Sequence, residues 1–530
     1  MRFKHALLVA ATAATVWLAA PASQAETLRW AFQGDAKSLD PYTLNETFTL
    51  GFLGNVYEGL TKRDQDLQIV PGLATSWEIV EPTRWRFHLR EGVTFHNGNP
   101  FTADDVVFSA NRVRAEGSDL TTRIGADVEV VKVDDHTVDF VTQEPNPIIH
   151  YEWDTWYIMD KEWAEENDAV APTTASGEQE SFASYNANGT GPFQIQSHEP
   201  GVQSVFVKND DWWDEPKHNI DEAIFTPIGS DATRVAALLS GEIDVMYPVP
   251  VQDLERVNNN DGTTALTGPE LRTIFLGMDQ MRDELLYSDV KGKNPFKDVR
   301  VRQAFYHAID IEAIKDKVMR GLSEPSALMI SPLLFAHSDE FERPAYDPDK
   351  AKALLAEAGY PDGFEVGMDC PNDRYVNDEA ICQAIVAMLA RVGVSIDLLA
   401  QPKAQYFAKV LASGGYDTSF YLLGWTPGSF DSWNVLSNIE HCRNEKGEGS
   451  PFNLGGYCNE EVDALTKQIL VETDEDKRND LIRQAFKITT GEAAHIPLHQ
   501  QGLAWGKADK VELVQRADNQ FLMYWVTVNE

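Results

Sequence analysis

The residues that come closest to catalytic groups are a serine–lysine pair and two histidines near the end of the chain. Ser288 and Lys291 have the S-x-x-K spacing of acylating enzymes, but the S-D-N and K-T-G partners of such a site are missing. His495 and His499 are separated by Pro497, which favours a strand or turn over a helical metal pair. No G-x-S-x-G, H-E-x-x-H or C-x-x-C motif occurs. We therefore predict no catalytic residues, no metal site and no cofactor.

The composition of the chain indicates which classes of molecule it can bind. The 530 residues include 45 Lys plus Arg against 83 Asp plus Glu, a formal net charge of -38. Such an acidic chain repels a phosphate backbone, so nucleic-acid binding is excluded. Because 43% of the residues are hydrophobic, the chain can bury several cores, and we expect a few domains.

The first 25 residues have the pattern of a secretory signal peptide. Arg2 and Lys4 precede an apolar run over residues 6–20, and small residues stand at the expected cleavage site around Ala25. The run is too short for a membrane anchor, and no cysteine follows it for lipid attachment. We expect cleavage after residue 25 and a periplasmic, monomeric protein that is not a lipoprotein.

Four cysteines lie in the second half of the chain, in two local pairs. Of three possible connectivities we favour Cys370 with Cys382 and Cys442 with Cys458, because these loops are short and the compartment is oxidising. A zinc site is disfavoured by the spacing, and free buried thiols remain an alternative.

Local patterns predict a mixed α/β fold. Residues 83–90 alternate apolar and polar side chains as a half-buried strand does, and Thr102 with Asp105 resembles a capping box before a helix. Further helices are expected from Asp231 to Gly241, after Asp347, and over residues 377–391. Helices and strands therefore alternate along the chain.

A series of motifs then closely resembles the bacterial extracellular solute-binding proteins of family 5, the peptide- and nickel-type receptors of ABC importers. The motifs occur in the family's order over almost the whole chain after the signal peptide. They are LATSW (73–77), WRFHLREGVTFHNG (85–98), TADDV (102–106), GTGPF (189–193), GEIDV (241–245), VRVRQAF (299–305) and AID (308–310).

The resemblance implies a two-lobed periplasmic binding protein fold of the type II, cluster C kind, with an extra subdomain in the first lobe. By analogy, lobe I comprises residues 26–70, 187–272 and 495–530, and its added subdomain residues 71–186. Lobe II comprises residues 273–494, and two crossover strands form the hinge.

The same resemblance implies a function without catalysis. The lobes close on a small ligand, and a membrane ABC permease transiently recognises the closed protein. We predict a peptide or a carboxylate-bearing, peptide-like ligand. An opine-like conjugate, a sugar or a metal chelate is the alternative, and an exported hydrolase is a weaker one because no nucleophile–base pair can be recognised.

Candidate ligand-binding residues also follow from the resemblance. Peptide-binding members carry an aspartate three residues after a Gly-Trp pair, where it binds the ligand's ammonium group; here the third residue after Trp425 is Gly428. Asp431 could replace that charge, or it could simply order its own loop. An ordinary free-amine peptide is therefore less favoured, because a buried ammonium group needs a counter-charge.

The remaining candidates are an arginine, aromatic residues and two hydrogen-bond donors. Arg374, next to Tyr375, matches the family's carboxylate receptor, with a surface ion pair to Asp373 or Asp378 as the alternative. Trp425, Trp433, Tyr406 and Trp505 offer aromatic surface, although core packing is more common. Asn45 and Thr47 could donate hydrogen bonds from the opposite lobe.

Overall fold

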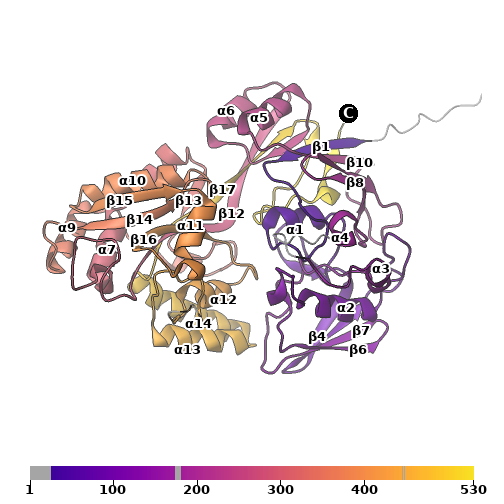
Figure 1. The fold of residues 1–530 in the computed structure, drawn as a ribbon, viewed down its shortest axis with the longest axis horizontal. Helices are drawn as coiled ribbons and strands as arrows, with labels where there is room; N and C mark the ends of the chain where they lie inside the picture. Colours follow the sequence, from indigo (N-terminus) through magenta and orange to yellow (C-terminus); the bar gives the residue numbers. More distant parts are fainter. Residues whose placement is uncertain (1–25, 174–180, 445, 447, 530) are drawn as a thin grey trace, which may run out of the picture.

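The computed structural model describes residues 26–173, 181–444, 446 and 448–529. Figure 1 shows two lobes side by side, and both β1 and the C-terminal end lie in the same one, lobe I. The expected signal peptide, residues 1–25, falls outside the described residues.

One mixed sheet of eleven strands runs through both lobes, in the order β15-β14-β16-β12-β17-β11-β1-β10-β9-β8, with β13 paired to β17. Its strands are β1 (Thr27–Phe32), β8 (Phe193–Glu199), β9 (Gln203–Lys208), β10 (Glu222–Pro227), β11 (Val245–Tyr247), β12 (Thr263–Met278), β13 (Ser323–Pro325), β14 (Glu365–Pro371), β15 (Ser395–Gln401), β16 (Phe420–Trp425) and β17 (Ile496–Ala508). The predicted α/β class is confirmed.

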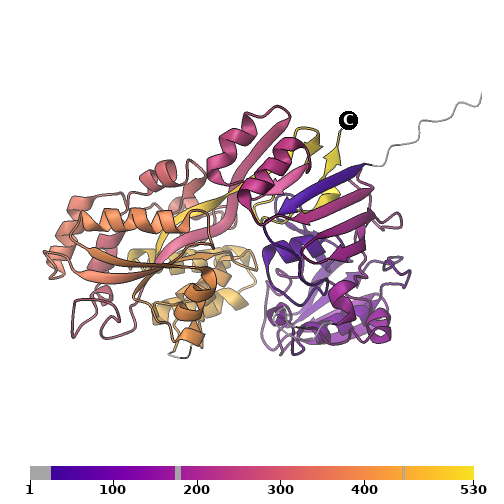
Figure 2. The same cartoon turned by 45° about the horizontal axis from the view of Figure 1, so that its top comes forward.

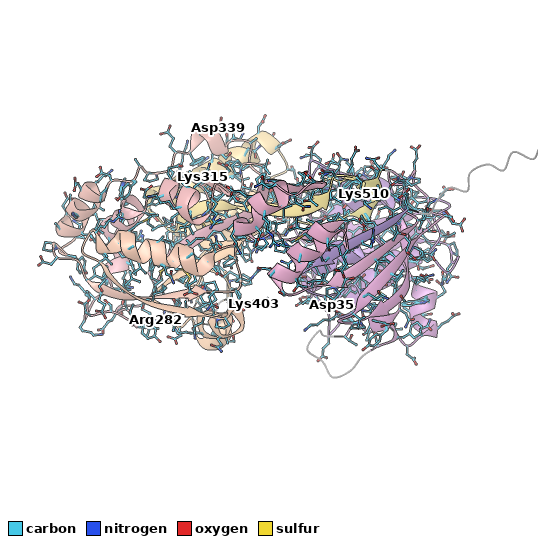
Figure 3. The ribbon with its side chains drawn as sticks, turned by 90° about the horizontal axis from the view of Figure 1, so that it is seen from above. Asp35, Arg282, Lys315, Asp339, Lys403 and Lys510 are labelled. Atoms are coloured by element: carbon cyan, nitrogen blue, oxygen red, sulfur yellow. A yellow bond between two sulfur atoms is a disulfide. The ribbon has the colours of Figure 1, made fainter. Side chains whose placement is uncertain are left out.

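Two long antiparallel strands connect the lobes. β12 and β17 pair from Thr263 with Ala508 in lobe I to Leu276 with Ile496 in lobe II, and Figure 2 shows them crossing between the lobes. In the view from above, Lys315 of lobe II and Lys510 of lobe I lie on opposite sides of this crossover (Figure 3). The crossover therefore provides the connection about which the lobes can move.

Lobe I adds smaller sheets and short helices to its part of the large sheet. Its elements are β2 (Thr61–Arg63), β3 (Ile69–Pro71), β4 (Ala74–Glu81), β5 (Arg84–Leu89), β6 (Glu129–Asp134), β7 (Thr137–Val141), β18 (Val511–Glu512), β19 (Thr527–Val528), α1 (Thr47–Leu53), α2 (Ala103–Val113), α3 (Lys161–Glu166), α4 (Phe182–Tyr185), α5 (Asp231–Ser240) and α6 (Leu254–Asn258). A single hydrophobic core extends from β1 through the β4–β7 sheet, so the two parts of lobe I are packed as one unit.

The predicted local elements of lobe I are present. β5 alternates buried and half-buried residues as expected, and α2 begins at the capping box that Thr102 forms with Asp105. α5 ends at Gly241, whose positive φ of 75° suits a residue without Cβ. Its N-cap is Ser230 rather than Asp231, which becomes the first helical residue.

Lobe II contains the remaining helices around β13–β16. They are α7 (Val299–Ala308), α8 (Ile311–Ala313), α9 (Pro348–Glu357), α10 (Asp378–Ala390), α11 (Lys403–Val410), α12 (Ser432–Val435), α13 (Glu460–Val471) and α14 (Glu475–Gly491). α9 and α10 correspond to the helices expected after Asp347 and over residues 377–391. Within the described residues, no helix has both the length and the apolar character that a bilayer crossing requires.

Both predicted disulfides are present in lobe II. Cys370 at the end of β14 is bonded to Cys382 in α10, and Cys442 is bonded to Cys458 just before α13. The first bond therefore links the two elements on either side of the segment 371–377.

A fully buried ion pair joins α2 to the start of lobe I. Arg112 donates to both carboxylate oxygens of Asp40 at 2.8 and 2.6 Å, and neither side chain is exposed. We predict that Arg112→Met lowers the free energy of unfolding by about 3–5 kcal/mol, because Asp40 is left as a buried unpaired charge. Urea unfolding followed by tryptophan fluorescence measures the change. The exposed pair Lys217–Glu215 provides the control: Lys217→Met should cost less than about 1 kcal/mol, and equal effects of the two variants would contradict the prediction.

A buried acid in lobe II makes stability depend on pH. Burial raises the pKa of Glu440 from 4.5 to about 8, only partly offset by the Thr489 hydroxyl. Its neighbour His495, with Nδ1 4.0 Å from Glu440 Oε1, has a pKa lowered by burial to about 3. At neutral pH both groups are therefore uncharged in the folded protein.

Between about pH 4.5 and 8, Glu440 is protonated when folded and ionised when unfolded, so its contribution to stability is lost as the pH rises. We predict that Glu440→Gln raises the urea midpoint relative to the wild type at pH 8 but not at pH 4.5. Glu461→Gln, at an exposed site of α13, should leave both midpoints unchanged. A Glu440→Gln difference that does not change with pH would contradict the assignment.

Candidate ligand-binding site

A cavity of about 630 Å³ lies beside the crossover and is lined by both lobes; we call it the solute cavity. Lobe I contributes the residues before and at the start of α1 and the segment 247–252, and lobe II contributes the segment 373–377. β12 and β17 supply the wall between them. A cavity of this size suits a small organic ligand.

The segment that carries Arg374 is held in place at its backbone. The Asp378 carboxylate accepts the N–H groups of Arg374 and Tyr375 at 2.9 and 3.0 Å, and Val376 N–H donates to Gln501 Oε1 at 3.0 Å. These bonds connect the segment to α10 and to β17. The Arg374 side chain is thus presented to the cavity from a fixed backbone.

Arg374 carries an unneutralised charge. Its side chain is open to the cavity, and no carboxylate in the described part of the chain forms an ion pair with it, in contrast to the alternative of pairing with Asp373 or Asp378. The surrounding protein desolvates the group and Arg272 repels it, so its pKa is lowered. An anionic ligand group would relieve both effects.

Arg272 and Glu270 on β12 also line the cavity, and sequence reasoning missed them. Arg272 Nη2 lies 3.3 Å from Glu270 Oε1, and its Nε donates to Thr426 Oγ1 at 3.1 Å. Gln501 on β17 donates to Glu270 Oε2 at 2.5 Å. The available signal was that Glu270 and Arg272 are the two charged residues of this strand and stand at alternate positions, so their side chains lie on the same face.

On the lobe I side, Asn45 and Thr47 line the cavity as the sequence analysis expected. Asn45 N–H donates to Asp119, and its Oδ1 accepts a bond from Arg123 at 3.0 Å. The amide is therefore oriented by lobe I, and its NH₂ group is left to act as a donor. Trp505 of β17 lines the same cavity.

Four other expected ligand residues, Tyr406, Trp425, Asp431 and Trp433, lie outside the solute cavity. Tyr406 is completely buried and donates to the Leu422 carbonyl at 2.7 Å, so it is a core residue. Trp425 packs on Phe452 and donates to Asn434 Oδ1 at 3.0 Å.

Asp431 forms a buried ion pair with Arg478, with two bonds of 2.7 and 2.8 Å, and caps α12. Its charge is already neutralised, so it does not replace the aspartate missing at position 428. The alternative, that Asp431 orders its own loop, matches the observed contacts.

Trp433 lines a second interlobe cavity, of about 690 Å³. This second cavity lies between residues 122–152 of lobe I and residues around α12 of lobe II. Among the lining residues that the structure describes, none is common to the two cavities.

Gly428 lies against lobe I. A Cβ at this position would lie 2.9 Å from Glu152 Oε1, closer than real Cβ contacts occur. Glu152 itself pairs with Arg123, at 2.5 Å. An aspartate at position 428 would therefore require the end of the Glu152 side chain to shift.

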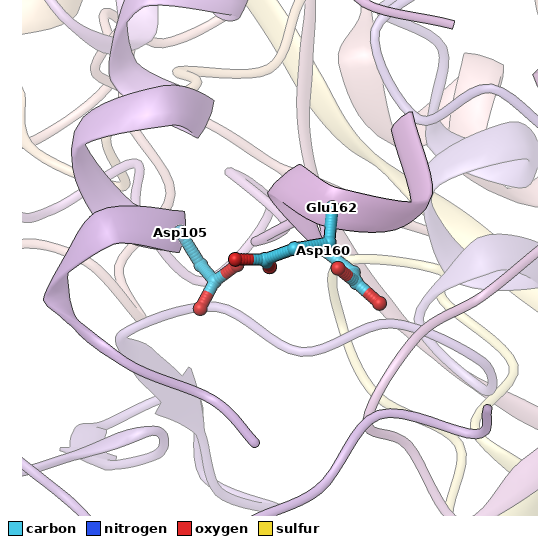
Figure 4. Close-up of side chains that lie close together, drawn as sticks. All are labelled: Asp105, Asp160 and Glu162. Carbon is cyan, nitrogen blue, oxygen red and sulfur yellow. The ribbon is translucent and has the colours of Figure 1, made fainter. Parts of the chain in front are cut away.

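Three carboxylates away from both cavities lie close enough together to suggest a cation site: Asp105, Asp160 and Glu162 (Figure 4). Asp105 accepts bonds from Thr102 and Lys161 N–H, and Asp160 accepts them from Trp163 N–H and three Asn side chains. These oxygens are already used in helix capping and loop contacts, which explains the cluster without an ion.

The solute cavity contains groups that can bind a small ligand. Its described lining has no Ser, Cys, His or Lys side chain; it presents arginines, amides, carboxylates and aromatic rings. Such groups hold a ligand by charge, hydrogen bonds and apolar contact.

Comparisons with known proteins agree with this geometry. The chain is 29% identical to the dipeptide-binding protein of Escherichia coli K12 over 494 residues, covering 87% of each chain, and 25% identical to the glutathione-binding protein GsiB of Salmonella typhimurium over 509 residues, covering 93% of each. The structure of the substrate-binding protein CtaP of Listeria monocytogenes superposes with a TM-score of 0.82 at 21% identity, covering 96% of this chain and 100% of that one.

This structural match covers nearly the whole chain. It confirms the predicted fold, which is that of the cluster C periplasmic binding proteins. The model of the bacterial extracellular solute-binding proteins, family 5 (middle segment), matches residues 68–447, more than half of the chain. The protein therefore belongs to family 5 of the extracellular solute-binding proteins, the non-catalytic binding components of peptide- and nickel-type ABC importers.

Proposed function

We propose that the protein captures a small carboxylate-bearing ligand, a peptide or a peptide-like compound, in the solute cavity and delivers it to an ABC permease. The unpaired Arg374 guanidinium is the observation that carries this proposal. A planar guanidinium can hold a carboxylate through two parallel hydrogen bonds.

The surroundings of Gly428 favour a ligand without a free ammonium group. Glu152 is the carboxylate nearest to this position, and its charge is neutralised by Arg123. A buried ammonium group there would lack a free counter-charge. At this position an N-blocked peptide or an opine-like conjugate therefore fits better than an unmodified dipeptide, although Gly428 itself does not line the solute cavity, whose carboxylates include Glu46.

The relatives support a peptide-like solute. By their names, two of them bind a dipeptide and glutathione, and glutathione is itself a modified peptide. Among these choices, the cavity's arginines and amides select for a carboxylate and for backbone-like amide groups.

The division of the chain remains part of the proposal. Residues 26–70, 187–272 and 495–530 would form lobe I, residues 71–186 its added subdomain, and residues 273–494 lobe II. The passage of β12 and β17 between the lobes supports the boundaries near residues 272 and 495.

The anion site can be tested with Arg374→Ala. Titration calorimetry measures the affinities of N-acetyl-dialanine, dialanine and dialanine amide, and of any ligand that native mass spectrometry finds retained. The three probes differ in whether they carry a free carboxylate and a free ammonium group, so their affinities show which group is bound. We expect Arg374→Ala to weaken carboxylate ligands about 10- to 100-fold, the loss of one or two hydrogen bonds to a charged group.

Arg391→Ala is the matched control, because Arg391 is an exposed arginine at the other end of α10, outside the cavity. It should leave every affinity unchanged. If Arg374→Ala has no effect on any carboxylate ligand, or if dialanine amide binds as well as dialanine, the proposed role of Arg374 is wrong.

We also propose that residues 1–25 are cleaved on export to the periplasm and that the mature protein carries no lipid. The intact mass of the exported protein should correspond to a chain that begins at Glu26 with two disulfides. A mass that includes the first 25 residues, or an added acyl group, would contradict this.

A further inference from the structure

One of the contacts between the two lobes is made by a loop of lobe II, residues 426–431, which we call the clasp loop. It connects β16 to α12 and reaches Arg63 at the end of β2 in lobe I. The Arg63 guanidinium lies 4.2 Å from the centre of the Phe430 ring, and its Nη2 donates to the Ser429 carbonyl at 3.4 Å. This is a cation–π contact between the lobes, supported by a long hydrogen bond.

Lobe I holds Arg63 ready for this contact. Its Nη1 donates to the Leu67 carbonyl at 2.8 Å, its Nη2 to the Tyr151 carbonyl at 2.5 Å, and its Nε lies 3.4 Å from Asp154 Oδ2. The side chain is only 5% exposed. Because these bonds lie in the plane of the guanidinium, its face is left for an aromatic ring.

The clasp loop is equally constrained in lobe II. The Asp431–Arg478 ion pair fixes its C-terminal end, and Phe430 N–H donates to the Pro427 carbonyl at 3.1 Å. Phe430 has a φ of 54°, in the left-handed region that residues with a side chain rarely adopt. Such a conformation costs about 1–3 kcal/mol and marks a residue that its surroundings hold in place.

A second contact lies beside the first. Gly428 packs against Glu152, which pairs with Arg123, and Arg123 in turn bonds to Asn45 at the edge of the solute cavity. Glycine is the residue that allows this close approach, because a Cβ would meet the Glu152 carboxylate.

The clasp loop lines the second cavity through Ser429 and reaches the edge of the solute cavity through the contacts of Gly428 with Glu152, of Glu152 with Arg123 and of Arg123 with Asn45. Arg123 and Ser429 line the second cavity, whereas Asn45, the bonding partner of Arg123, lines the solute cavity. We infer that the clasp, formed by Arg63 and the clasp loop, closes the solute cavity at this end and limits the length of the ligand that the closed protein can hold. This inference rests on the proposed function and adds to it a limit on ligand size.

Phe430→Ala and Arg63→Ala remove the clasp from either side. Arg90→Ala is the matched control, because Arg90 stacks on Trp213 at 4.0 Å within lobe I. N-acetyl-dialanine and N-acetyl-pentaalanine serve as short and long probes in titration calorimetry. We expect the wild type to bind the long probe at least 10-fold more weakly than the short one, and both clasp variants to bind the long probe at least 10-fold more tightly than the wild type does.

A second measurement needs no ligand. Spin labels at Lys37→Cys and Lys403→Cys, exposed sites on the two lobes, report the interlobe distance by double electron–electron resonance. The fraction of molecules with a short interlobe distance should be lower in Phe430→Ala and Arg63→Ala than in the wild type, and unchanged in Arg90→Ala. Phe430→Ala is decisive if Arg63→Ala fails to fold, because the Phe430 ring is only partly buried.

The outcomes separate this inference from the proposed function. If neither probe binds the wild type but the clasp variants open, the peptide-like ligand is wrong and the limit on length is overturned, while the clasp contact stands. If both probes bind the wild type equally, or if the distances do not change in either variant, the clasp does not limit the ligand.

Discussion

The antiparallel pairing of β12 with β17 is the constraint on which the rest of the molecule depends. The two strands carry one sheet through both lobes, and their register shifts between Pro269 and Thr273. Glu270 and Arg272 lie within this irregular stretch and both line the solute cavity. In a regular strand these side chains would be buried or paired. The irregular pairing at this point instead directs them toward the solute cavity.

Hydrogen bonds connect the same strands to the anion site. Gln501 on β17 donates to Glu270 on β12 and accepts a hydrogen bond from the backbone N–H of Val376, two residues after Arg374. Glu270 neutralises Arg272, which leaves Arg374 as the unpaired cation of the cavity within the described residues. The net charge of -38 does not prevent anion binding, because salt largely screens surface charges that lie more than about 8 Å away. Attraction of an anion is therefore a local property of Arg374.

The sequence predicted what depends on neighbours along the chain. The capping box at Thr102, the alternation in β5 and the short disulfide loops all follow from local spacing, and the order of the motifs identified the family and hence the two-lobed fold. Arg374, Asn45 and Thr47 were placed by motif analogy and do line the cavity.

The sequence could not show which side chains the fold uses internally. Asp431 is neutralised by Arg478, 47 residues away, and Tyr406 faces the core of lobe II rather than the cleft. Glu270 and Gln501 are 231 residues apart and meet only because their strands pair. The clasp contact, too, contributes only a small part of the free energy that closure needs. A cation–π contact of about 0.5–2 kcal/mol changes an open-to-closed ratio by at most about 30-fold. A switch from mostly open to mostly closed needs about 5.5 kcal/mol. The proposed clasp therefore only biases closure, and a ligand that bridges Arg374 and the lobe I wall would supply the remainder.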